Sequence, residues 1–437
     1  MTFDRRPPSP DLPLPSNLPS QSEPSTDRSA ELVSLIRAEI EASPERRITF
    51  ARYMERALYE PGLGYYSQPA DRPTDAGDFL TAPETHPIFG WTVARRIEAM
   101  WIELGRPRPF TLIEHGAGSG TLALSIVDGL RRRNSADLLE AIRYEPVESN
   151  PNRLADLRRR FEEAGLADRL LISSAPLNAR PHDVGPPASE PTASAMPTAS
   201  AGGVPVTGVI IANEFLDALP VHRVVVRGGD LLELFVVWPD EPRAEPRAEP
   251  RAESGGFAEV AAEPSTLELA ARLAEDGIDI GQLAEGQIGE ISLGLDPWLR
   301  GVAARLDRGF ALVIDYGYDA AELYGPRRLA GTLLGYRSHR VEANPFAAPG
   351  LVDLTAHVDF TAVGRLAASH GFRTVALTTQ SEFLVAAGLE DELRALQTSP
   401  DLTLADYTRA RSGIVRMLDP RHMGRFRVLV LARDELR

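Results

Sequence analysis

Two residue types are missing from this 437-residue chain, which contains neither cysteine nor lysine. The lack of cysteine excludes disulfides, thiolate nucleophiles, Cys-ligated zinc and iron–sulfur clusters. The lack of lysine excludes a Schiff-base lysine and the phosphate-binding lysine of a P-loop. Runs of about 18 consecutive apolar residues are also missing, so no segment is expected to span a bilayer. With 43% hydrophobic residues, the chain can bury a sizeable core, and we expect a soluble protein.

The charge is one-sided, with a formal net value of −15. A negative surface repels phosphate backbones, which disfavours nucleic acid and favours a protein or small-molecule acceptor. The eight histidines show no H-E-x-x-H or similar ligand spacing, so we expect no metal site. The Pro- and Ser-rich start is typical of a disordered tail and not of a signal or transit peptide. We therefore expect a cytoplasmic protein that makes no membrane contact.

Composition divides the chain into three parts. We expect a disordered tail over 1–28, a helical and loop region that covers the site over 29–108, and an α/β domain over 109–437. Two insertions in the last part are expected to be disordered, because they cannot bury enough apolar surface to fold. They are a Pro/Ala/Ser-rich segment at about 184–203 and an E-P-R-A repeat at about 240–256.

Short apolar runs alternate with helical patterns after residue 109. Such alternation is typical of a parallel sheet buried on both faces. The expected fold class is therefore α/β, with helices on both faces of the sheet, an N-terminal helical segment and helical insertions. The insertions include a helical lid region over about 382–417. The expected strands are Phe110–Glu114, Ala141–Glu148, Arg169–Ser173, Gly208–Asn213, Phe310–Asp315 and Arg425–Arg433.

A glycine-rich turn follows the first of these strands and precedes a helix. It contains Glu114, Gly116, Gly118 and Gly120 at alternate positions. Glycines allow a sharp turn and leave no Cβ where a cofactor would approach the helix N-terminus. A dinucleotide fingerprint, G-x-G-x-x-G, would need glycine in place of Thr121, so the turn instead resembles the first motif of Rossmann-like methyltransferases. We predict cofactor contacts from these four residues; the alternative is a tight turn without a ligand.

Glu148 ends the second strand, just before Asn150-Pro151 starts a helix. A carboxylate at that tip can accept both hydroxyls of a ribose, in NAD and S-adenosylmethionine sites alike. Because Glu145 lies inside the strand, Glu148 is the preferred cofactor-binding candidate. The alternative is a solvated carboxylate at the entry of the helix.

Asn213 and Glu214 lie where a buried strand runs into the segment Glu-Phe-Leu-Asp-Ala-Leu-Pro. Ligands of open α/β sheets bind beyond the carboxyl ends of the strands, so both residues are expected to border the reacting centre. A long loop earlier in the chain carries Tyr59, Tyr65 and Tyr66. These rings could stack on an acceptor or an adenine, and the alternative is packing.

Together these residues resemble the MidA-like methyltransferases, a family that includes the mitochondrial complex I assembly-factor protein-arginine methyltransferases. The resemblance runs from about Ile48 to Val430, apart from the two insertions. The glycine turn of the family usually reads E-L-G-P-G. This chain departs from it at two positions, where His115 replaces the leucine and Ala117 replaces the proline. The matching segments are Leu58 to Pro61, Gly64 to Tyr66, Gly77 to Glu84, Asn213 to Pro220, Ile314 to Gly317, Gly350, Asp353 to Phe360, Gln380, and Phe383-Leu384.

The resemblance implies a Rossmann-like methyltransferase fold, S-adenosyl-L-methionine as cofactor and a protein substrate, with arginine as the acceptor in the mitochondrial members. Carboxylates would orient a guanidinium, and the candidates are Glu214, Asp217, Asp78 and Glu84, with Tyr65 and Tyr66 beside them. Asp217 and Asp78 could instead serve loop hydrogen bonding and helix capping. We predict that Asn213 both binds the cofactor and takes part in catalysis. A homodimer is one candidate assembly.

Two other functions stay open at this point. An NAD-dependent oxidoreductase would share the fold, although the glycine spacing opposes it. A non-catalytic assembly factor would keep the cofactor pocket for its structural role.

Overall fold

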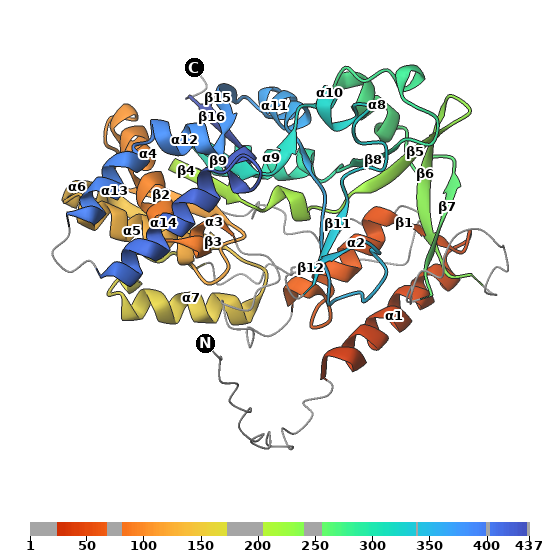
Figure 1. Cartoon of the computed structure of the whole chain (residues 1–437), viewed down its shortest axis with the longest axis horizontal. Helices are drawn as coiled ribbons and strands as arrows, with labels where there is room; N and C mark the ends of the chain where they lie inside the picture. Colours follow the sequence, from red (N-terminus) through yellow and green to blue (C-terminus); the bar gives the residue numbers. More distant parts are fainter. Residues whose placement is uncertain are drawn as a thin grey trace, which may run out of the picture.

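The computed structural model of this chain describes residues 24–67, 81–172, 204–239, 256–337, 340–398 and 403–434 (Figure 1). Both predicted insertions lie outside these ranges, except for Gly256. The helix α1 (Pro24–Ala42) begins inside the predicted tail 1–28, so the expected boundary lies too late in the chain. No helix in the described ranges is long and apolar enough to cross a membrane.

A six-stranded sheet forms the centre of the left half of Figure 1. Its strands are β2 (Phe110–His115), β3 (Ile142–Val147), β4 (Val206–Asn213), β9 (Leu306–Asp315), β15 (Arg373–Thr379) and β16 (Arg427–Arg433). Four of them run parallel in the order β9-β4-β2-β3. β16 lies antiparallel to β9, and β15 lies antiparallel to β16 at the edge. The α/β fold class is thereby confirmed.

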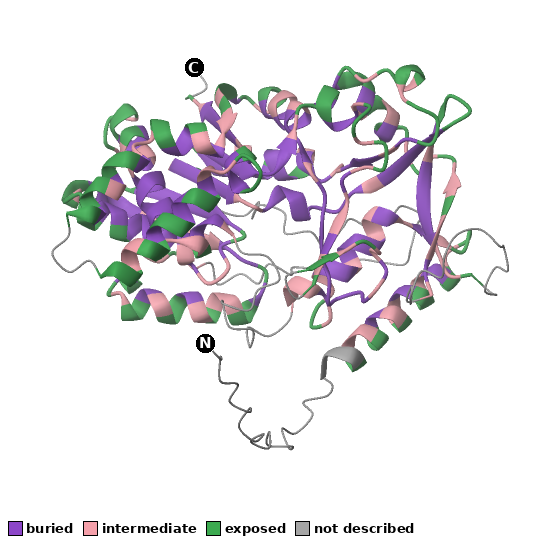
Figure 2. Ribbon diagram, viewed as in Figure 1, coloured by how far each residue is buried: buried purple, intermediate pink, exposed green. Residues whose placement is uncertain are grey.

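Helices cover both faces of this sheet. Alternate side chains of a strand point to opposite faces, so Leu112 and Ile211 enter one core whereas Ile113 and Ile210 enter the other. Figure 2 shows the strands buried and the outer surfaces of the covering helices exposed. The expected layers are thus present. The first core includes α4 (Ile88–Glu103), α5 (Thr121–Arg132), α7 (Pro151–Glu163), α12 (Gln380–Ala386), α13 (Leu389–Gln397) and α14 (Leu404–Leu418), and the second includes α9 (Leu295–Arg305) and α11 (Phe360–Ser369).

The predicted strand Arg169–Ser173 is wrong. Ala167–Arg169 forms a 3-10 helix, and sheet pairing at the described end of this segment is one isolated bridge between Tyr144 and Leu170. The next residue, Leu171, is 41% exposed. A parallel strand needs cover on both faces, and the exposed Leu171 lacks it.

An antiparallel sheet, which the sequence did not predict, lies in the right half of Figure 1, and four of its five strands follow β4 in the chain. β6 pairs with β1, β5 and β7, and β5 pairs with β8. One of its faces shares a core with α1 and α2 (Phe50–Tyr59), which places the N-terminal helices against it. The strands are β1 (Arg47–Thr49), β5 (His222–Arg227), β6 (Asp230–Val237), β7 (Ala258–Ala262) and β8 (Ile288–Ile291).

A small sheet of β11, β12 and β13 brings the chain back to the N-terminal helices. The hydroxyl of Tyr53 donates to the carbonyl of Pro345 at 2.8 Å. Gly350 has φ +81°, and a Cβ added there would lie 2.4 Å from the carbonyl oxygen of Leu63, so the close approach requires glycine. These contacts hold β13 beside the loop that follows α2. The remaining elements are β10 (Gly317–Tyr318), β11 (Leu334–Arg337), β12 (Arg340–Glu342), β13 (Asp353–Thr355), β14 (Val358–Asp359), α3 (Ala82–Thr85), α6 (Ala136–Ala141), α8 (Glu268–Glu275) and α10 (Ala320–Leu323).

Candidate functional site

A cavity of about 240 Å³ opens where the parallel strands β2, β3 and β4 end. β2 lies between β3 and β4. The chain passes from β2 to β3 on one side and then crosses to β4 on the other side, so the strand order reverses at β2. Open α/β sheets bind their ligands at such a reversal. Among the predicted site residues, Asp78 lies outside the described ranges and Gly120 lies away from the cavity. The others line it, namely Tyr65, Tyr66, Glu84, Glu114, Gly116, Gly118, Glu148, Asn213, Glu214 and Asp217.

The three glycines of the turn play different parts. All have positive φ, between +54° and +77°. A Cβ on Gly118 would meet nothing within 4 Å, so the space in front of it is open to a ligand. A Cβ on Gly116 would meet the ring of Phe215 at 3.0 Å, and one on Gly120 would meet Leu157 at 3.0 Å. Gly120 therefore permits the close packing of Leu157 against the turn, and its predicted contact with the cofactor stays a prediction.

His115, which departs from the family pattern, is fully enclosed beneath this turn. The indole Nε1–H of Trp298 donates to its Nδ1 at 2.8 Å. Burial lowers the pKa of His115 to about 4, so the ring is neutral. A buried acceptor needs a donor, and Trp298 provides it.

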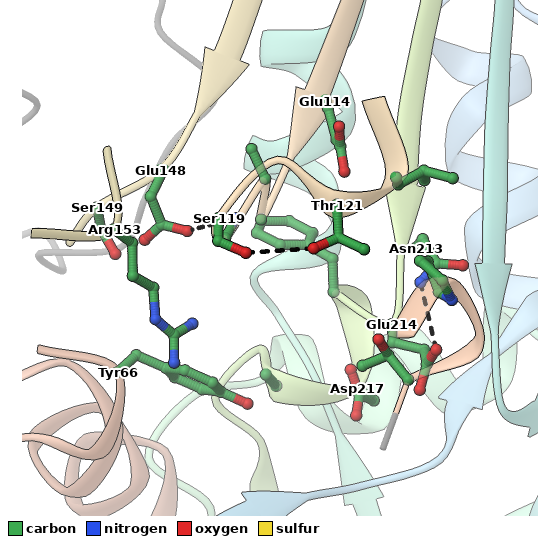
Figure 3. Close-up of a pocket in the computed structure, with 18 of the residues that line it drawn as sticks. Tyr66, Glu114, Ser119, Thr121, Glu148, Ser149, Arg153, Asn213, Glu214 and Asp217 are labelled. Carbon is green, nitrogen blue, oxygen red and sulfur yellow. Dashed lines mark hydrogen bonds between the residues drawn. The ribbon is translucent and has the colours of Figure 1, made fainter. Parts of the chain in front are cut away.

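Glu148 closes one end of the cavity with two backbone hydrogen bonds. The N–H of Gly118 donates to its Oε2 and the N–H of Asn150 donates to its Oε1, both at 2.8 Å. The Asn150 side chain caps α7, and its Nδ2 donates to the carbonyl of Tyr66 at 2.8 Å. Figure 3 shows Arg153 on this side of the cavity, above Tyr66. The rival residue Glu145 is held elsewhere, because both of its oxygens accept from Arg305.

Glu114 lies at the back of the cavity. It accepts the hydroxyl of Tyr144 at 2.8 Å. Burial raises the pKa of Glu114 to about 8, with a smaller contribution from the Glu148 carboxylate. At neutral pH this side chain is therefore mainly protonated.

Glu214 occupies the opposite end, together with Asn213 (Figure 3). It adopts a left-handed conformation with φ +50°, which is rare outside glycine, and its N–H donates to the carbonyl of Ile314 at 2.8 Å. Its Oε1 accepts from the N–H of Ala82 and from Nδ2 of Asn213. Glu214 Oε2 and Asn213 Oδ1 are buried without a hydrogen-bond partner in the described part of the chain. Burial raises the pKa of Glu214 to about 8.

Asp217 is one turn further along the same segment and is 5% exposed. Its Oδ2 accepts the hydroxyl of Tyr316, while its Oδ1 is a second buried carboxylate oxygen with no partner among the described residues. Burial and the neighbouring Asp315 carboxylate raise the pKa of Asp217. A backbone hydrogen bond from Ala218 acts in the opposite direction and lowers the pKa of Asp217, so the predicted alternative of loop hydrogen bonding and capping describes part of what this side chain does.

Asp315 is the residue that holds this segment in place. Its Oδ2 accepts the backbone N–H groups of Phe215, Leu216 and Asp217, and its Oδ1 accepts that of Tyr316. The side chain is completely buried. It therefore fixes the turn that carries Glu214 and Asp217 to the end of the neighbouring strand β9.

The loop after α2 forms the third wall. Tyr59 and Tyr66 stack with ring centroids 5.5 Å apart, and Tyr65 meets Tyr66 edge to face. The Glu84 carboxylate accepts from the N–H of Thr81 in the capping box of α3. The packing and capping alternatives thus describe part of what these residues do, although all of them line the cavity.

Sequence reasoning did not select several residues that line the cavity. Arg153, Tyr316, Asp353 and Thr355 all face it. Tyr316, Asp353 and Thr355, with the supporting Asp315, lie in segments that match the MidA-like family, which was the available signal. Arg153 sits on the exposed start of α7 and has no local pattern to mark it.

Residues 92–378 match the family model described as "Putative S-adenosyl-L-methionine-dependent methyltransferase". This match spans more than half of the chain.

Two solved structures from Burkholderia thailandensis resemble the whole fold. One, which is bound to S-adenosyl-homocysteine, is 29% identical with a TM-score of 0.77, and 95% of each chain is covered. The other is 31% identical with a TM-score of 0.74 over the same shares. Among curated proteins, the mitochondrial protein arginine methyltransferase NDUFAF7 homolog of Drosophila melanogaster is 27% identical over 97% of this chain and 89% of its own length. The Homo sapiens protein arginine methyltransferase NDUFAF7 is 26% identical over 80% of this chain and 72% of its own length.

Proposed function

This chain belongs to that family of S-adenosyl-L-methionine-dependent methyltransferases, and we propose that it methylates an arginine side chain of a protein. The glycine turn suits this cofactor, because the space in front of Gly118 is open and a side chain at that position would occupy it. When bound, S-adenosyl-L-methionine supplies a methyl group on a sulfonium for in-line transfer to an acceptor atom. The residues of the chain must therefore position two ligands and exclude water from the space between them.

At the Glu148 end we propose that the chain binds the cofactor. Glu148 is already oriented by two backbone N–H groups and retains lone pairs that can accept ribose hydroxyls. Gly116 and Gly118 let the backbone approach the ligand closely. Glu114 and Asn213 would contact the part of the cofactor that lies nearest the ends of β2 and β4.

At the opposite end we propose that Glu214 and Asp217 bind the acceptor. The observation that carries this assignment is a pair of buried carboxylate oxygens, Glu214 Oε2 and Asp217 Oδ1, that have no hydrogen-bond partner among the described residues. Buried polar atoms are nearly always hydrogen-bonded, so a donor is expected to arrive there with a ligand. A guanidinium carries five N–H donors and a positive charge, which suits two adjacent carboxyl groups.

The names of the relatives support the same acceptor, since those proteins are called protein arginine methyltransferases. The acidic character of the cavity agrees with it. Among the described residues that line the cavity there are six carboxyl side chains and a single arginine, Arg153. A protein substrate in the cytoplasm is part of the proposal.

The test is transfer of labelled methyl groups from S-adenosyl-L-methionine to proteins of an extract prepared from cells that lack this enzyme. We expect label in proteins, released on hydrolysis as methylated arginine. Label on another residue would contradict arginine as the acceptor. If the protein binds the cofactor but transfers no label, the alternative of a non-catalytic assembly factor would be favoured.

A further inference from the structure

Arg160 reaches the glycine turn from the helix α7, which packs against that turn through Leu157. Its Nη1 donates to the carbonyl oxygen of Ser119 at 2.8 Å, to the hydroxyl oxygen of Ser119 at 2.8 Å and to that of Thr121 at 3.1 Å. Ser119 and Thr121 line the cavity, and Arg160 does not. Arg160 thus contacts two residues of the cavity wall without lining the cavity itself.

This contact restricts the protons of the two hydroxyl groups. An oxygen that accepts from a guanidinium cannot direct its own proton back toward it, because a guanidinium has donors and no acceptor. The two hydroxyl oxygens are 3.2 Å apart, so one proton can join them, as Figure 3 shows between Glu148 and Asn213. The second proton has no acceptor in the described part of the chain, and it is available to a ligand in the cavity that Ser119 and Thr121 line.

The charges around the cavity favour an anionic group beside these hydroxyls. Six carboxyl side chains line the cavity among the described residues, and a carboxylate close to them is unfavourable. Arg160 places a positive charge next to Ser119 and Thr121, and its hydrogen bonds within the described ranges all end on uncharged oxygens. Its neighbour Arg159, in contrast, pairs with two carboxylates. The charge of Arg160 can therefore stabilise an anion that the two hydroxyls bind.

S-adenosyl-L-methionine has one anionic group, the carboxylate of its methionine part. Its ribose hydroxyls are donors, which suits the proposed contact with Glu148. A carboxylate only accepts, and it suits hydroxyl donors whose oxygens already accept from a cation. Hydrogen bonds to such a charged group are shorter and stronger than those between neutral groups. The hydroxyls of Ser119 and Thr121 thus match the part of the cofactor that carries the negative charge.

We propose that Arg160 is a positioning residue, which orients the hydroxyls of Ser119 and Thr121 to donate to the carboxylate of the methionine part of the cofactor. The inference rests on the proposed placement of the cofactor, with its ribose at Glu148, and does not depend on an arginine acceptor. Arg160 itself touches no part of the ligand and acts through the two side chains that do.

Two other roles for the arginines of α7 make different predictions. Because Arg160 also donates to the carbonyl of Ser119, it could serve only to hold the turn. Its loss would then weaken every ligand that contains adenosine to the same extent. Alternatively Arg153, which lines the cavity on the Glu148 side, could bind the carboxylate directly. In that case Arg153→Gln, and not Arg160→Gln, would weaken binding of the carboxylate.

The experiment measures, by calorimetry on the full-length protein, the affinity for two ligands that differ by one group. S-adenosyl-homocysteine carries the carboxylate. Decarboxylated S-adenosyl-homocysteine keeps the adenosine, the sulfur and the amino group and lacks the carboxylate. Thermal melting of each variant without ligand reports the stability of the fold.

Arg160→Gln should weaken binding of S-adenosyl-homocysteine by about 10-fold, as for loss of a charge-assisted hydrogen bond, and should change binding of the decarboxylated ligand much less. Arg160→Lys, which keeps the charge, should recover part of the affinity. The double variant Ser119→Ala with Thr121→Val should show the same selective loss. Adding Arg160→Gln to it should cost little more, because residues that act through one another are not additive. Arg159→Gln removes an exposed arginine of the same helix and should leave both affinities unchanged.

The outcomes separate this inference from its rivals and from the proposed function. Equal losses of both ligands in Arg160→Gln, or a selective loss in Arg153→Gln with none in Arg160→Gln, would overturn it. If Arg160→Gln does not fold, the double variant decides, and wild-type affinity for S-adenosyl-homocysteine in that variant would contradict the inference. If wild type binds neither ligand, the inference falls with the proposed cofactor site. If the ligands bind as expected and no arginine is methylated, the proposed acceptor is wrong and this inference stands.

Discussion

The two ends of the cavity differ in how completely their carboxyl groups are hydrogen-bonded. Both oxygens of Glu148 accept backbone N–H groups at 2.8 Å. Glu214 and Asp217 each retain one buried oxygen without a partner in the described structure. The Glu148 end is therefore ordered before any ligand binds, whereas the Glu214 end contains buried oxygens that lack a hydrogen-bond donor among the described residues.

This difference assigns separate roles to the two ends. A group held by backbone N–H donors has a fixed orientation and can select a ligand of fixed shape. Buried carboxyl groups without donors are costly to folding, and their raised pKa values reflect the same lack of solvation. A cationic acceptor would supply the missing hydrogen-bond donors. The unfavourable free energy of burying these carboxyl groups in the free protein would then be relieved on binding, which increases the affinity for the acceptor.

The largest effect on the difference between the two ends is expected from filling the space in front of Gly118. Gly118→Val should lower the affinity for S-adenosyl-homocysteine by at least about 100-fold, since a β-branched side chain is strained at φ +54° and occupies the ligand's place. Gly165→Val is the control. It has φ +68°, has open space around its Cβ and does not line the cavity. Calorimetry and thermal melting of both variants distinguish loss of the site from backbone strain, and normal affinity in folded Gly118→Val would contradict the assignment.

Glu214→Gln tests the opposite end, because it keeps the shape of the side chain and prevents it from ionising when a cationic acceptor binds. We expect turnover to fall by about 100-fold or more while the affinity for S-adenosyl-homocysteine changes little. Single-turnover methylation alongside cofactor titration measures the two separately. Full turnover would remove Glu214 from the acceptor site, and a parallel loss of both would indicate a structural role.

Glu148→Ala should affect only the cofactor end. The loss of charge-assisted hydrogen bonds predicts an affinity for S-adenosyl-homocysteine that is about 10-fold to 100-fold weaker. Glu145→Ala is the matched control, because that carboxylate binds Arg305 and should alter thermal stability without altering affinity. An unchanged dissociation constant in Glu148→Ala would place the ribose contact elsewhere.

The smallest expected effect is the contribution of Glu214 to the pH dependence of stability. Burial raises the pKa of Glu214 from 4.5 to about 8, so the folded protein keeps a proton that the unfolded chain has already released in this window. The contribution of this group to stability is present below about pH 4.5 and is lost as the pH rises toward about 8. Without ligands, the melting temperature of wild type should therefore fall more steeply over this range than that of Glu214→Gln. Parallel curves would show that Glu214 ionises normally.

Local patterns were sufficient for the cofactor end. The strand Phe110–His115, the glycine turn and Glu148 lie within 39 consecutive residues, and each is specified by short-range rules of strand, turn and helix start. The end of β4 at Asn213 was predicted for the same reason. The backbone of a strand–turn–helix unit places such residues without help from the rest of the chain.

Local patterns failed where cover by other elements decides the structure. The apolar run Arg169–Ser173 looks like a buried strand, yet Leu171 is exposed and, of the described residues 169–172, Leu170 alone forms a bridge to the sheet. None of the predicted strands corresponds to the antiparallel sheet of β1 and β5 to β8. Strand propensity reports a fit to a half-buried surface, and only the surrounding packing provides that surface.

What the sequence alone determined about this protein is the class of fold, the cofactor turn and the carboxylates that follow its strands. What only the tertiary structure decided is the acceptor end, where Asp217, Asp315 and Asp353 come together from three separate segments. No periodicity links these positions. Their burial and their mutual repulsion arise from chain segments that meet only after folding, because desolvation and charge coupling depend on distance in space and not along the chain.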